Sequence, residues 1–109
     1  MTLRRVVAVA TAVLALEGWL AAARAEDPAA VFKENCAKCH GETGQADTPA
    51  SATLKVPKLA GDAKIAGMAV PDIVKMMKEN EKHKTMLKKA TEEQLVAGAT
   101  HAKALAQGK

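Results

Sequence analysis

The sequence predicts an all-α domain, because three segments carry helical signals and none shows the alternating pattern of a strand. The first predicted helix starts at Pro28, behind Asp27 as its N-cap, and runs to the region of Cys36. The second starts at Pro71 and the third follows Thr91. Residues 41–58 and 83–90 are expected to be loops, the first because Gly and Pro recur in it.

The second and third helices have the clearest patterns. In the second helix, four apolar residues at helical spacing form one face: Ile73, Val74, Met76 and Met77. Lysines and Glu79 cover the opposite face. In the third, Thr91 and Gln94 form a capping box, and Gly108 is a stop signal just after the predicted end at about Gln107. Its expected buried face carries Leu95, Ala99, Ala102 and Leu105.

Residues 1–25 resemble a signal peptide. Arg4 and Arg5 precede an apolar run over 6–16, and Ala23-Arg24-Ala25 matches an A-x-A cleavage site. The run is much shorter than the roughly 20 apolar residues of a membrane span, so an uncleaved anchor is the weaker reading. We therefore expect export to the periplasm, removal of residues 1–25, no stable membrane insertion afterwards, and one mature domain over 26–109.

The predicted mature domain is lysine-rich and poor in aromatic residues. It has 13 lysines, no arginine and 11 carboxylates, so its net charge is +2, and Phe32 is its sole aromatic residue. Nucleic-acid recognition relies on arginine forks or stacked aromatics, which this composition lacks. A core with one aromatic residue needs a further stabilising element, such as a disulfide, a metal or a cofactor. A disulfide between Cys36 and Cys39 would close too small a loop to stabilise the fold much.

Cys36-Ala37-Lys38-Cys39-His40 is a C-x-x-C-H motif, the attachment pattern of c-type haem. Two thiols three residues apart on a helical turn can reach both vinyl groups of one haem. The adjacent imidazole of His40 then becomes the proximal iron ligand. A redox dithiol site, a zinc site and a structural disulfide are weaker readings, since no βαβ pattern and no further closely spaced metal ligands accompany the motif.

The surrounding segments resemble class I bacterial monohaem cytochromes c. Phe32, four residues before the first cysteine, and Gly41, directly after the histidine, match that family, and residues 56–61 resemble its Pro-x-Leu-x-Gly loop. The resemblance covers most of residues 28–106. It implies a small cytochrome c fold, with three main helices and loops around one covalent haem c.

The resemblance also implies further site residues. Met86 lies where the family has its sixth iron ligand, directly before the last helix, and the Pro57 carbonyl is expected to accept a hydrogen bond from His40. Met68 is a remaining alternative to Met86, and Met76 and Met77 are more readily core residues. His83 is a rival ligand that we expect to be solvated on a lysine-rich loop.

Two departures from the family concern the crossing of the terminal helices. His101 stands where the family has Tyr or Trp, and the family's small glycine is replaced at Pro28, beside Ala29 and Ala30. Haem-wall candidates from the apolar pattern are Leu59, Ile73, Leu87 and Leu95.

A His/Met-ligated haem predicts a one-electron carrier rather than an enzyme. The expected partners are redox proteins: a dehydrogenase as donor, and an oxidase or another cytochrome as acceptor. The acidic surfaces of these partners are expected to dock on a ring of lysines on this protein, formed by Lys38, Lys84, Lys88 and Lys89. The alternatives are a haem subunit fixed to a periplasmic dehydrogenase, and an open-site haem enzyme or gas-binding sensor.

Overall fold

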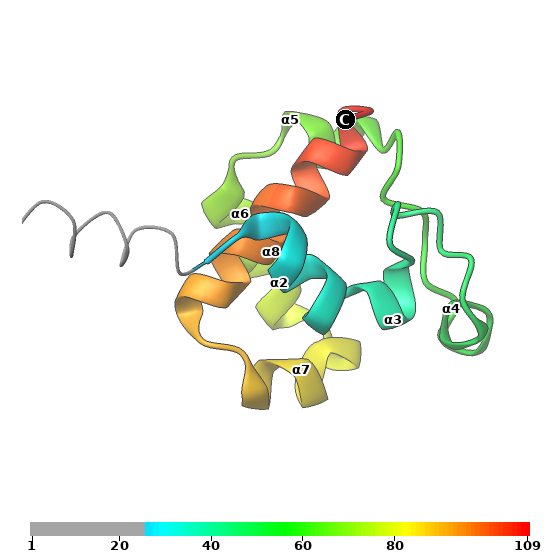
Figure 1. The fold of residues 1–109 in the computed structure, drawn as a ribbon, viewed down its shortest axis with the longest axis horizontal. Helices are drawn as coiled ribbons and strands as arrows, with labels where there is room; N and C mark the ends of the chain where they lie inside the picture. The colour runs from blue at the N-terminus through cyan, green and yellow to red at the C-terminus, as the bar shows by residue number, and fades with distance from the viewer. Residues whose placement is uncertain (1–25) are drawn as a thin grey trace, which may run out of the picture.

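The first and last helices of the domain cross each other and hold its two ends together. In the computed structural model, which describes residues 26–109, α2 (Pro28–Asn35) packs across α8 (Glu92–Ala106) (Figure 1). Phe32 is only 1% exposed and contacts the ring of His101, with the ring centroids 5.0 Å apart. His101 therefore fills the crossing in the way that its position in the sequence predicts.

The described residues contain α-helices, one short 3-10 turn and no strand, so the all-α prediction is confirmed. Between α2 and α8 the chain forms α3 (Ala37–His40), α4 (Pro49–Leu54), α5 (Ala63–Gly67), α6 (Val70–Glu79), η1 (Glu81–His83) and α7 (Lys84–Lys89). The predicted signal peptide lies outside the described residues, so its removal stays a prediction. Within 26–109, no helix has both the length and the apolar content that a membrane crossing requires.

Most of the predicted helix ends agree with the structure. The second predicted helix, α6, starts one residue early at Val70, with Pro71 in its first turn. The capping box of α8 is formed, since Gln94 N donates to Thr91 Oγ1 and Thr91 N donates to Gln94 Oε1, at 3.1 and 2.9 Å. Asp27 precedes α2 as predicted, but its side chain makes no capping hydrogen bond.

Both predicted loops were partly wrong, because each contains a short helix. Within residues 41–58, Thr48 and Ser51 form a second capping box that starts α4. Within 83–90, the chain continues from η1 directly into α7, and Asn80 caps η1 by accepting from Lys82 N. Asp62 caps α5 in the same way, a helix that the apolar pattern does not reveal.

The buried side chains form two separate clusters on α8. The larger joins α8 to α5 and α6 and consists of Ile65, Ile73, Val74, Leu95, Ala99 and Ala106. The smaller joins α8 to α2 and α3 and consists of Phe32, Ala37 and Ala102, with Cys36, Leu59 and Leu105 half-buried against it. The predicted face of α8 is thus confirmed, except that Leu105 is half-buried. Neither cluster is large, as expected of a chain with so few big apolar residues.

Replacing Phe32 should test how much the helix crossing depends on one ring. We expect Phe32→Ala to lower the free energy of unfolding by about 3–5 kcal/mol, because it removes a fully buried side chain and leaves a cavity. Chemical denaturation followed by circular dichroism measures this loss. Leu54→Ala is the control, since Leu54 is 38% exposed and should cost far less. Equal losses in the two variants would contradict the role given to Phe32.

Candidate functional site

The C-x-x-C-H segment forms a single turn of helix directly after α2. Cys39 N and His40 N both donate to Cys36 O, at 3.2 and 3.0 Å, and Gly41 N donates to Ala37 O at 2.8 Å. Cys36 is the N-cap of α3, and Cys39 and His40 lie within it, so the three residues share one hydrogen-bonded turn. The structure brings these three predicted site residues together.

Cys36 lies where α3 meets α8. A Cβ placed on Gly98 of α8 would lie 3.4 Å from Cys36 Sγ, which is close van der Waals contact. Burial, and to a lesser degree the neighbouring Cys39, raises the pKa of the Cys36 thiol to about 11. A reactive dithiol needs a lowered thiol pKa, so this environment argues against the redox-dithiol reading.

The carbonyl of Cys39 is held by hydroxyl groups from α4. Ser51 Oγ donates to Cys39 O at 2.6 Å, and Thr48 Oγ1 donates to the same oxygen at 3.4 Å. Ser51 is the buried polar residue here, 3% exposed. The capping box of α4 thus also fixes the end of the motif, which no feature of the C-x-x-C-H pattern itself predicts. The Thr-x-x-Ser pair formed by Thr48 and Ser51, nine and twelve residues after Cys39, is the sequence signal that could have revealed it.

Gly41 turns the chain away from the motif. Its φ is +81°, and a side chain there would also collide with the Asp47 carboxylate. Only glycine fits this position without strain, which explains in physical terms why a glycine follows the histidine.

His40 is half-buried, and its Nδ1 is fully buried without a hydrogen-bond partner among the described residues. Burial lowers the pKa of His40, and the nearby His83 lowers it further. The neutral imidazole, the form that binds metals, is therefore favoured. Pro57 is exposed, and no hydrogen bond joins its carbonyl to His40 Nδ1. The role of Pro57 stays a prediction.

His83 is near His40, and this corrects the expectation that it is solvated. The two ring centroids are 6.2 Å apart, and His83 is half-buried with its Nδ1 2.8 Å from Met77 O. Asn80, which caps η1, is the sequence signal that could have revealed an ordered turn here. Met86 lies on α7 and is half-buried against the larger apolar cluster. Met68, Met76 and Met77, from other segments, pack against the same cluster. Its role as a ligand stays a prediction.

The other candidate residues fall into two groups. Ile73 and Leu95 are buried in the larger cluster and Leu87 packs against it, whereas Leu59 packs against the smaller cluster. The lysines of the predicted docking ring are all exposed: Lys38 on α3, and Lys84, Lys88 and Lys89 on α7.

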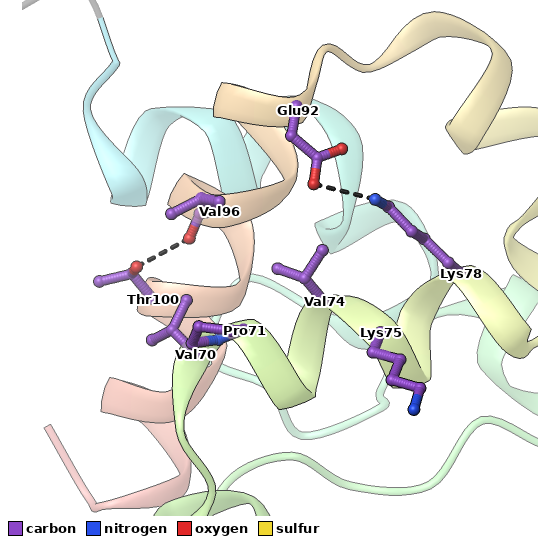
Figure 2. Close-up of a pocket in the computed structure, with 8 residues that line it drawn as sticks. All are labelled: Val70, Pro71, Val74, Lys75, Lys78, Glu92, Val96 and Thr100. Carbon is purple, nitrogen blue, oxygen red and sulfur yellow. Dashed lines mark hydrogen bonds and ion pairs between the residues drawn. The ribbon is translucent and has the colours of Figure 1, made fainter.

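A shallow groove between α6 and α8 lies away from these residues. Figure 2 shows it lined by apolar side chains that include Val74 and Val96, with the Lys78–Glu92 ion pair (2.9 Å) at one end. None of the motif residues lines it. It is therefore not the site of the C-x-x-C-H chemistry.

The motif residues fit a covalently bound haem. Both thiols and the imidazole project from one turn, and burial favours the neutral imidazole that can bind iron. The apolar core is divided into two small clusters that a large flat cofactor would supplement. Within residues 26–109, no three His, Cys, Asp or Glu side chains are grouped as a metal ion would need. The zinc reading therefore has no support in this part of the chain.

The fold and the site together define a cytochrome c domain. Residues 23–101, more than half of the chain, match the model of the family described as cytochrome c oxidase, cbb3-type, subunit III. The chain belongs to this family of cytochrome c domains, which implies covalent haem c and haem-based electron transfer. Searches of curated proteins and of solved structures found no match.

The hydroxyl of Ser51 should stabilise the domain measurably. We expect Ser51→Ala to lower the free energy of unfolding by about 1–3 kcal/mol, because the Cys39 carbonyl keeps only its longer bond to Thr48. Thr53→Ala is the matched control, since it removes an exposed hydroxyl from the same helix. Thermal unfolding of the two variants measures the difference. A Ser51 variant as stable as the control would show that the bond contributes nothing.

Proposed function

We propose that this protein is a periplasmic one-electron carrier with a single haem c. Each thiol, of Cys36 and of Cys39, would add across one vinyl group, so that a sulfur–carbon bond forms and the thiol hydrogen passes to the neighbouring carbon. His40 would bind the iron. The observation that carries this proposal is the single helical turn that presents both cysteines beside a half-buried imidazole.

A second protein ligand would close the iron to exogenous molecules. The sequence predicts Met86 for that position, and Met86 and His83 both lie in the segment that joins α6 to α8. When bound, a haem with two protein ligands supplies a one-electron iron couple with no open coordination position. The protein then serves as a carrier, in line with the family, whose domains are typically electron carriers rather than enzymes.

The predicted signal peptide supports a periplasmic location. The exposed lysines of α3 and α7 support docking on acidic surfaces of redox proteins, such as a dehydrogenase donor and an oxidase or cytochrome acceptor.

A haem subunit fixed to a dehydrogenase has the same chemistry, and co-purification with that enzyme would identify it. An open-site enzyme or gas sensor differs, because its resting reduced form would bind carbon monoxide.

Removal of both thiols should release the cofactor. The exported protein should show a Soret band, and its haem should resist extraction by acidified acetone. In Cys36→Ser/Cys39→Ser we expect all of the haem that remains bound to be extractable, because no thioether is left. Optical spectra of the acetone extract and of the precipitated protein measure how much haem is in each. A wild-type sample with no Soret band after full maturation would overturn the proposed function.

Charge reversal on α7 should slow electron transfer to an acidic partner. We expect Lys84→Glu/Lys88→Glu/Lys89→Glu to lower the second-order rate constant about tenfold or more at low ionic strength, with the gap closing as salt is added. Stopped-flow mixing with a small acidic redox protein measures it. A matched control reverses lysines at the other end of the molecule, near the C-terminus (Figure 1): Lys64, Lys103 and Lys109. Equal slowing in both variants would contradict docking through α7.

A further inference from the structure

The geometry around His40 points to a second histidine as its counterpart on the haem iron. We propose that His83, rather than Met86, is the sixth ligand, which makes the haem bis-histidine. This inference rests on the proposed attachment of haem through Cys36, Cys39 and His40. It departs from the His/Met ligation that the resemblance implies.

The separation of the two imidazoles is the first argument. The centroids of His40 and His83 are 6.2 Å apart. A metal–imidazole bond is roughly 2 Å, and the ring centre lies about 1 Å beyond the nitrogen, so two imidazoles on opposite sides of one metal have centroids about 6 Å apart. The rings are tilted by 43°. The spacing therefore already matches that of two ligands sharing one iron.

The hydrogen bond of His83 is the second argument, because it decides the tautomer. Nδ1 of His83 is 2.8 Å from Met77 O, and a carbonyl oxygen can only accept. Nδ1 must therefore carry the proton, and in the neutral ring the lone pair is on Nε2. Metal-binding histidines are commonly oriented in this way, with one ring N–H donated to a backbone carbonyl and the other nitrogen left for the metal.

The turn that carries His83 is held by contacts on several sides. His83 N donates to Asn80 O at 3.0 Å, and Lys82 N donates to the Asn80 side chain at 3.0 Å. Lys82 Nζ reaches across to α4 and donates to Leu54 O at 2.6 Å. Because α4 also holds Cys39 O through Ser51, the two histidine-bearing segments are linked through the same short helix. His83 is thus pre-positioned relative to the motif, as a ligand needs to be.

The methionines have a different explanation in the packing. Met86 is half-buried against the cluster around Ile73 and Leu95, and Met68, Met76 and Met77 contact the same cluster. Methionine side chains are flexible and commonly fill irregular gaps in apolar cores, and this packing accounts for all four. His83 and Met86 are three residues apart on a continuous helical path, so backbone position alone would suit either. The ring spacing and the tautomer favour His83.

The test uses the exported haem protein and its optical and near-infrared magnetic circular dichroism spectra in the oxidised state. A bis-histidine haem lacks the far-red sulfur-to-iron charge-transfer band and shows a near-infrared band at the energy of two nitrogen ligands. We expect this pattern in the wild type, with no variant required. A far-red sulfur band in the wild type that disappears in Met86→Ala would overturn the proposal and establish Met86.

Variants sharpen the result. We expect His83→Ala to lose its second ligand, so that the reduced protein binds carbon monoxide at one molecule per haem, and His83→Met to gain the far-red sulfur band. We expect Met86→Ala to keep the wild-type spectrum and to bind no carbon monoxide. His101→Ala is the control, because His101 is also half-buried but packs on Phe32. If His83→Ala keeps the wild-type spectrum, the proposal fails.

The outcomes separate this inference from the function on which it rests. A matured wild-type protein without a Soret band would refute haem binding itself. A protein with that band, thioether-bound haem and a sulfur-ligated iron would keep the carrier function and refute only the role of His83.

Discussion

The rest of the structure depends on how the turn from Cys36 to His40 is held in place. That turn follows α2 directly, so α2 sets its direction, and α2 is in turn fixed by Phe32 against α8. On one side Gly98 lets α8 approach Cys36 closely, and on the other Ser51 donates a hydrogen bond to the Cys39 carbonyl. Two thiols and one imidazole can serve a single rigid cofactor only if their backbone does not move. Each of these contacts restricts that movement.

Small size makes this arrangement costly to stabilise by ordinary packing. The domain has one aromatic residue, and alanine supplies five of its eleven buried apolar side chains. The others are Phe32 and five larger aliphatic residues. The apolar core is split into two clusters that both contact α8. A covalent haem adds a large apolar body that does not dissociate, so it supplements a core that the side chains alone leave small.

Axial ligation decides what such a cofactor can do. A thioether opposite the imidazole raises the reduction potential, whereas a second imidazole keeps it lower. Both choices leave no open position on iron, so either is compatible with carrying electrons. The choice between His83 and Met86 therefore concerns the potential at which the proposed carrier would work, rather than the class of protein.

The sequence by itself determined the helical class, the attachment motif and both ends of α8, because these depend on local capping, helical periodicity and the spacing of a few residues. It missed α4, α5 and the helical continuity from η1 to α7, whose capping residues are local but whose short lengths give no apolar period. Only the tertiary structure placed His83 near His40 and Ser51 on the Cys39 carbonyl. Those contacts join residues 12 or more apart in the chain, and their formation depends on how the loops fold back, which no local pattern encodes.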